Sequence, residues 1–125
     1  MTKFEIEYPI KSSVKVLYDG LTDSSKLTEW FCDEIRLMDN GNRMEFFWDG
    51  SGQIAKIIAK KDNKFIRFHW EDEDEETYFE MKIQIDEITN DVALFVTDFA
   101  EDDEVEEAKM LWDNQIKDLF QILGA

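Results

Sequence analysis

The chain has 125 residues, of which 43% are hydrophobic and 14% aromatic, so it can build one core and does not have the composition of a disordered protein. Its 30 acidic and 14 basic residues give a formal net charge of -16, which repels phosphate backbones and anionic headgroups and argues against nucleic acid and membrane surfaces as partners. Cys32 has no second cysteine to pair with, and the sequence lacks both a signal-peptide run and a membrane-spanning stretch, so we expect a cytoplasmic protein without membrane insertion.

The first predicted elements are one strand and two short helices. Apolar and charged residues alternate over 3–8, which is the pattern of a half-buried strand. Ser12 or Ser13 offers an N-cap for the first helix, and Thr22 or Asp23 offers one for the second. The apolar residues of these two helices are Val14, Leu17, Leu21, Leu27, Trp30 and Phe31.

Several predicted strands follow, separated by turn-forming segments at 39–42, 49–52 and 61–64 that indicate hairpins. The segment 79–85 alternates most regularly, whereas 92–99 is apolar on both faces, which predicts a strand that is central or covered on both sides. The residues that share a face are Met44, Phe46 and Trp48, then either Ala55, Ile57 and Ala59 or Ile54 and Ile58, then Ile66, Phe68 and Trp70, then Phe79, Met81, Ile83 and Ile85.

The strongest pattern predicts a long amphipathic helix over 103–123. Asp103 is its expected N-cap, accepting from the Glu106 N–H, and Gly124 is its expected stop. Its apolar stripe consists of Val105, Ala108, Trp112, Ile116, Leu119 and Leu123. With no internal repeat or linker, we expect a single α+β domain over 1–125, in which a curved antiparallel sheet of about six to seven strands wraps around this helix.

The segments 16–23, 27–31 and 110–112, in this order of elements, resemble the START-like (SRPBCC, helix-grip) superfamily. Within it, they are similar to the family related to the C-terminal domain of the activator of the heat-shock chaperone ATPase. In that family the tryptophan of the closing helix usually follows a glycine. Here Leu111 precedes Trp112, a departure that could fill space left open elsewhere.

The resemblance implies a ligand site between the closing helix and the concave face of the sheet. The competing interpretation is that the same side chains simply fill the core, since one apolar concavity describes both pockets and small cores. The candidate lining residues are Trp30, Phe46, Trp48, Phe68, Trp70, Phe79, Met81, Leu111, Trp112 and Ile116.

We therefore expect a non-enzymatic START-like module that binds a small apolar ligand in this cavity. The alternative is a co-chaperone-like domain that binds a protein partner. A polyketide cyclase/dehydratase-like enzyme is the second alternative, but it needs ionisable groups in the cavity, and the concave-face candidates are almost all apolar. No catalytic residue, cofactor or metal site is predicted.

Three polar features are weaker candidates. The acidic run Glu71–Glu76 could gather a hard cation, but a solvated loop is favoured because runs of like charge are usually hydrated. His69 shares a strand face with Phe65 and Arg67, which favours a surface pair or a cavity rim over catalysis. Cys32 has no basic neighbour in sequence and is expected to be a structural thiol.

Overall fold

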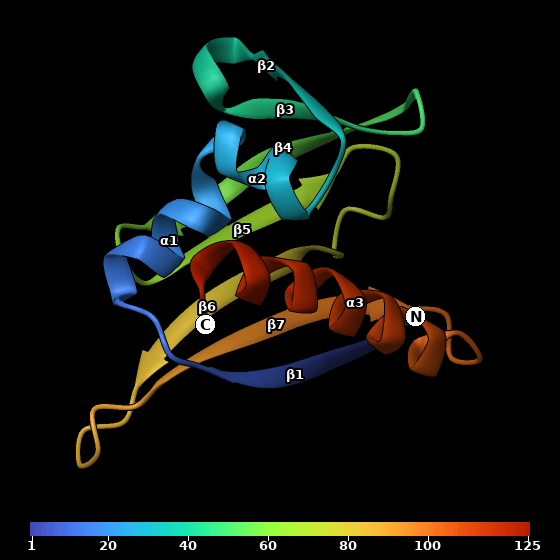
Figure 1. Ribbon diagram of the computed structural model, residues 1–125. Helices are drawn as coiled ribbons and strands as arrows, with labels where there is room; N and C mark the ends of the chain where they lie inside the picture. Colours follow the sequence, from blue (N-terminus) through green and yellow to red (C-terminus); the bar gives the residue numbers. More distant parts are fainter.

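A computed structural model describes all residues from 1 to 125 and contains one seven-stranded antiparallel sheet with three α-helices on its concave side (Figure 1). The sheet order is β1-β7-β6-β5-β4-β3-β2. This confirms the predicted helix-grip class, with two short helices after the first strand. The elements are β1 (Thr2–Ile10), α1 (Val14–Thr22), α2 (Ser24–Trp30), β2 (Glu34–Met38), the 3-10 turn η1 (Asp39–Gly41), β3 (Arg43–Trp48), β4 (Ser51–Lys61), β5 (Phe65–Trp70), β6 (Phe79–Ile85), β7 (Val92–Ala100) and α3 (Val105–Leu123).

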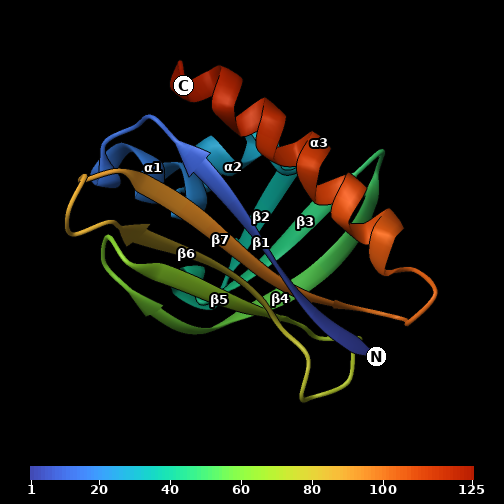
Figure 2. The same ribbon diagram turned by 90° about the horizontal axis from the view of Figure 1, so that it is seen from below.

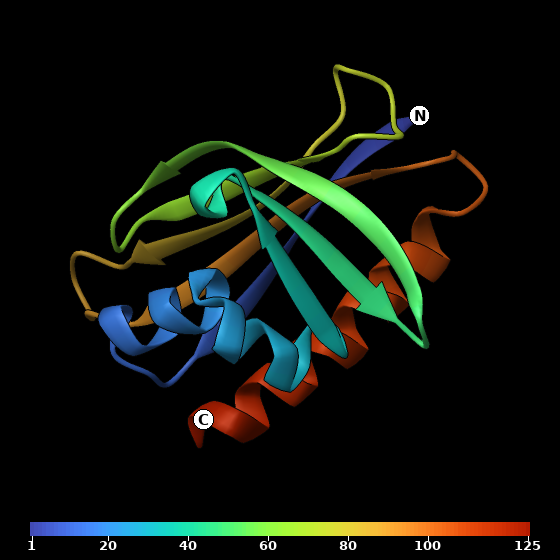
Figure 3. The ribbon, with the colours of Figure 1, turned by 90° about the horizontal axis from the view of Figure 1, so that it is seen from above.

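Successive hairpins join β2 to β7, and β1 pairs with β7 at the far edge. The β3–β4 turn consists of Asp49 and Gly50 with φ of 51° and 82°, the positive values that a two-residue hairpin turn requires, so β4 already begins at Ser51. Because β3, β5 and β7 run in the same direction, the loops that follow them lie at one end of the sheet (Figures 1 and 3).

Strand alternation places the predicted apolar faces against the helices. On β4 the first alternative holds only for Ala55, which is fully buried, and Ile57, which packs against the core. A bulge after Ile57 shifts the register, so Ala59 pairs with Arg67 on the outer face, and Ile58 is 47% exposed. Ile85 departs from the prediction for its strand. It is 51% exposed because β6 ends there.

The last strand, predicted to be central or covered on both sides, is an interior strand that pairs with β1 and β6, although β1 is the edge strand. All three helices cover the concave side of the sheet (Figure 3). The apolar residues of β7 that point to the opposite side are therefore not covered by a second layer. The register places Phe95 opposite Lys82 and Phe99 opposite Lys3. Phe99 also packs edge-on against Tyr78, with ring centroids 5.2 Å apart, which shields it in part.

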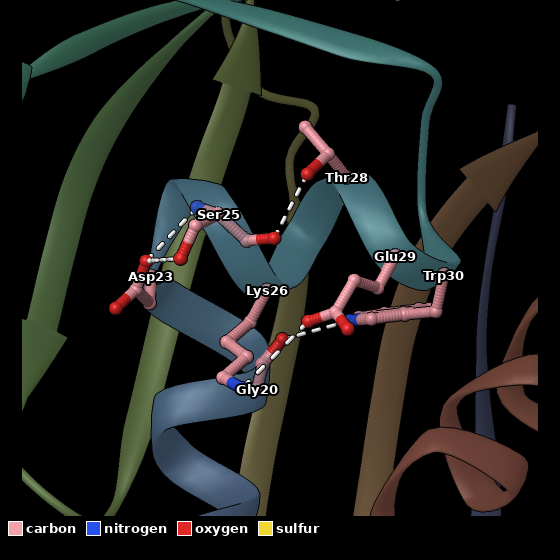
Figure 4. A network of polar contacts seen from close by, with 7 residues as sticks. All are labelled: Gly20, Asp23, Ser25, Lys26, Thr28, Glu29 and Trp30. Carbon is pink, nitrogen blue, oxygen red and sulfur yellow. Dashed lines mark hydrogen bonds and ion pairs between the residues drawn. The ribbon is translucent and has the colours of Figure 1, made fainter.

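Side-chain caps fix the two short helices, and Figure 4 shows the cap of the second one. Ser13 Oγ accepts from the Val16 N–H at 3.2 Å and begins α1. Asp23 accepts from both the N–H and the hydroxyl of Ser25, at 2.9 and 2.7 Å, and begins α2. The indole of Trp30 at the end of α2 donates to the Gly20 carbonyl at 2.7 Å, which ties the two helices together.

Helix α3 crosses the concave face and contacts β1, β7 and both short helices (Figure 2). The predicted Asp103 cap is wrong. A turn closed by the bond from the Glu104 N–H to the Glu101 carbonyl moves the N-cap to Glu104, which makes no side-chain bond, and the helix begins at Val105. Gly124 ends it in the left-handed conformation, with φ of 70°, as predicted. No helix is both long and apolar enough to cross a membrane.

Leu111 and Ile116 lie on different sides of α3. Leu111 is 61% exposed and Ile116 is 1% exposed. Leu111 therefore does not fill the core in the way that its place next to Trp112 suggested.

We predict that Ile116→Ala lowers the free energy of unfolding by about 2–5 kcal/mol, because it opens a cavity in the core. Leu111→Ala, on the same helix, should cost less than about 1 kcal/mol. Urea unfolding followed by circular dichroism measures both. Similar losses for the two variants would contradict this orientation of α3.

Candidate functional site

A hollow of about 200 Å³ opens between the first half of α3 and the sheet. We call it the helix-to-sheet pocket. Its lining residues are Phe31, Trp48, Trp70, Phe79, Asp98, Ala108, Leu111, Trp112 and Gln115. The structure thus brings together five of the predicted residues, namely Trp48, Trp70, Phe79, Leu111 and Trp112.

The other predicted residues lie elsewhere. Four are at most 1% exposed and belong to the packed core: Phe46, Phe68, Met81 and Ile116. Trp30 borders an adjoining surface groove of about 340 Å³, which also contains Cys32 and shares Phe31, Trp48 and Gln115 with the pocket. The large aromatic residues of the inner face therefore fill much of the concavity, and the open space lies only near its end.

Phe31 is a pocket residue that the sequence did not single out. As the C-cap of α2 it turns inward, and its ring centroid lies 5.5 Å from that of Trp48 and 6.0 Å from that of Trp112. Its carbonyl accepts from Trp48 Nε1 at 2.8 Å and from Gln115 Nε2 at 3.0 Å. One residue thus connects α2, β3 and α3 around the pocket.

Asp98 is the second residue that sequence reasoning missed. It follows Leu94 and Val96 on the inner face of β7, where its Oδ2 accepts from Trp112 Nε1 at 2.8 Å and its Oδ1 accepts from the Phe99 N–H at 2.7 Å. The signal was present in the sequence, because Asp98 is the only charged residue of a strand that is apolar apart from Asp98 and Thr97.

Burial raises the pKa of Asp98 above its ordinary value, and the negative charge of Glu73 adds to this. The hydrogen bonds from Trp112 and Phe99 act in the opposite direction because they stabilise the carboxylate. Asp98 and Trp70 also line a second hollow, of about 160 Å³, together with Glu73. The carboxyl group is therefore the one ionisable group of the helix-to-sheet pocket, and it also faces the hollow beside it.

The remaining polar candidates lie outside this pocket. His69 bonds through Nδ1 to the Thr77 carbonyl at 2.8 Å, on the outer face of the sheet. Cys32 is buried, and burial raises the pKa of its thiol to about 11. In the acidic run, Glu71 is bound by Arg43 at 2.5 and 2.8 Å, and no group of His, Cys, Asp or Glu side chains is arranged to hold a metal ion.

The most voluminous hollow, of about 890 Å³, lies along the outer faces of β5 and β6. Its lining is mostly charged and polar, and it includes Arg67 and Glu80, which pair with each other at 2.7 Å. Volume alone does not make it a ligand site, since ligand sites usually combine a mainly apolar lining with a few polar groups.

A family model described as START-like superfamily domain matches residues 1–125. The fold is similar to the solution structure of the Aha1 dimer from Colwellia psychrerythraea, with TM-score 0.80 and 20% identity, covering 98% of this chain and 96% of that one. Protein MLL2253 from Mesorhizobium loti matches with TM-score 0.80 and 18% identity, covering 98% and 97%.

DynU16, a protein of the dynemicin biosynthetic locus, matches with TM-score 0.82 and 16% identity; the match covers 98% of this chain and 47% of DynU16. No curated protein sequence matches the chain. At these identities the structural matches establish the fold alone.

Asp98 should leave a measurable mark on the pH dependence of stability. The pKa of an aspartate in an unfolded chain is about 4. Because burial raises the folded pKa of Asp98 above that value, the native state binds more protons in the window between the two. We predict that the wild-type protein loses stability relative to Asp98→Asn as the pH rises through this window.

Asp86→Asn is the matched control, because backbone bonds from Thr89 and Ile88 lower the pKa of Asp86. A carboxylate with a lowered pKa stabilises the folded protein above its unfolded pKa, and this stabilisation is lost as the pH falls through the folded pKa. The wild-type protein should therefore gain stability relative to Asp86→Asn as the pH rises, which is the opposite trend. Urea unfolding at several pH values measures both differences. A stability difference for Asp98→Asn that stays constant with pH would contradict the burial of this carboxyl group.

Proposed function

Because the chain belongs to the START-like superfamily, we propose that it is a non-enzymatic binding module that holds a small apolar ligand in the helix-to-sheet pocket. The observation that carries this proposal is the aromatic lining of the space beside α3. Burial of apolar ligand surface there would provide the affinity, at about 25 cal/mol per Å² before ordering costs.

The size of the pocket supports a ligand of few heavy atoms. Its volume is about 200 Å³, and an apolar cavity of about 150 Å³ is large enough to bind benzene. Phe79 and Phe31 are 1% and 5% exposed and form the deep part, whereas Leu111 is 61% exposed and borders the mouth. Long-chain lipids would exceed this space.

Two tryptophans of the pocket report on its occupancy. Trp48 and Trp112 each donate an indole N–H in a hydrogen bond beside the pocket, to the Phe31 carbonyl and to Asp98. Trp30 donates to the Gly20 carbonyl outside the pocket and serves as an internal reference. A ligand in the pocket should therefore shift the indole resonances of Trp48 and Trp112 and leave that of Trp30 in place.

We predict that benzene shifts these indole resonances in proton–nitrogen correlation spectra of the wild-type protein, and that Ala108→Phe abolishes the shifts by filling the pocket. Met110→Phe is the control, because Met110 lies two residues away on α3 and is 65% exposed. It should bind benzene as the wild type does. Absence of any benzene-dependent shift in the wild type, or unchanged binding in Ala108→Phe, would overturn the proposed site.

A protein-interaction function is the second candidate, and one observation favours it. Helix α3 leaves Met110, Leu111 and Ile122 at 65%, 61% and 38% exposure. The similar Aha1 structure is described as a dimer, and the corresponding partner here would be a second copy of this chain.

For this second candidate, sedimentation velocity should show a dimer that dissociates in Met110→Glu, because a charge on the exposed face would have to be buried at the interface. A concentration-independent monomer in the wild-type protein would exclude self-association through this face.

A further inference from the structure

The helix-to-sheet pocket combines aromatic walls with one carboxylate. We propose that its ligand is a small organic cation, an amine or a quaternary ammonium group, held by the faces of the tryptophans and by Asp98. The inference rests on the proposed function and names the chemical class of its ligand.

The walls are suited to a cation. Trp48, Trp70 and Trp112 all line the pocket, and the aromatic face that attracts cations most strongly is that of tryptophan. The ring centroids of Trp70 and Trp112 lie 5.1 and 6.0 Å from that of Phe79, so the rings form one continuous aromatic surface. A neutral apolar ligand would use the same surface, and the carboxylate therefore decides between the two.

Asp98 has no cationic partner within the protein. Its two oxygens accept one neutral N–H each, from Trp112 and from the backbone of Phe99. An ionised carboxylate has about four acceptor positions, so lone pairs remain available on both oxygens. A partly buried charge without a counter-charge costs free energy, and a bound ammonium group would supply the missing charge.

Two acidic segments flank the same end of the sheet. Segment 71–76 follows β5 and segment 101–107 follows β7; each contains six acidic residues and no basic one. Figures 1 and 3 show both loops at the end where β5 and β7 finish, next to the start of α3. Their only ion pairs are Glu71 with Arg43 and Glu106 with Lys109.

The remaining carboxylates of these segments are uncompensated and give the mouth region a negative potential. Such a field attracts cations and raises their association rate, and it repels fatty acids and other anions. Glu73 lies close enough for its charge to raise the pKa of Asp98, so the field extends to the pocket itself. The charge of the chain is thus concentrated where it would select the ligand.

The test compares choline with 3,3-dimethylbutan-1-ol, a neutral molecule of the same shape. Proton–nitrogen spectra of the wild-type protein, titrated with each compound, follow the indole resonances of Trp48 and Trp112. We expect choline to bind about tenfold more tightly than the alcohol. A cation on a desolvated aromatic face gains free energy of this order, and attraction to the carboxylate adds to it. Added sodium chloride should weaken choline binding and leave alcohol binding unchanged.

Asp98→Asn should abolish the preference for choline, and Asp86→Asn, which removes a carboxylate from the β6–β7 turn at the other end of the sheet, should keep it. Glycerophosphocholine tests the second source of this cation, a lipid headgroup, and its phosphate should weaken binding at the acidic mouth.

Equal binding of choline and the alcohol, or a preference that survives in Asp98→Asn, would overturn the cation inference and leave the pocket function standing. Failure of both compounds to bind would also overturn it. In that case the benzene titration decides whether the proposed function falls as well.

Discussion

The position of Phe31 is the constraint on which the rest of the structure depends. Its ring lies 5.3 Å from those of Trp30 and Phe46 and 5.8 Å from that of Phe79, so it contacts α2 and two strands of the sheet at once. Its carbonyl holds Trp48 and Gln115. The Asp23 cap begins α2, and the bond from Trp30 to the Gly20 carbonyl ties its end to α1. Because Phe31 is the C-cap of α2, the placement of these two short helices determines where its ring enters the core.

Around Phe31 the protein divides its concave face into a packed part and an open part. The packed part contains side chains such as Phe46, Phe68 and Ile116 that exclude solvent completely. The open part lies where the strands β3, β5 and β7 end and α3 begins, and it is bordered by Leu111 and Asp98. A small domain can leave such a space because the core beside it carries most of the apolar burial.

The hydrogen bond between Trp112 and Asp98 links this open part to the strongest feature of the sequence, the long C-terminal helix. It places a carboxylate beside aromatic rings, an arrangement that a core selected only for packing would not need. The START-like fold is shared by proteins of very different function, so the fold by itself does not identify a ligand. The chemistry of this one carboxylate and the charges around it carry the functional argument.

The sequence by itself determined the elements whose signals are local. Strand alternation, the turn at Asp49 and Gly50, the cap at Asp23 and the stop at Gly124 all depend on residues near one another in the chain, and each was predicted from them. Three of the nine pocket residues also followed from alternation, since it places Trp48, Trp70 and Phe79 on the inner face.

Only the tertiary structure decided which apolar residues fill the core and which border open space. Leu111 is an apolar residue next to Trp112 on the same helix as Ile116, yet the angle of α3 on the sheet leaves it exposed. Asp98 became a site residue because α3 lies across β7 in a position that brings Trp112 within hydrogen-bond distance of it. Such outcomes depend on the relative placement of elements far apart in the chain, and local periodicity specifies the face on which a residue lies but not the partner it meets there.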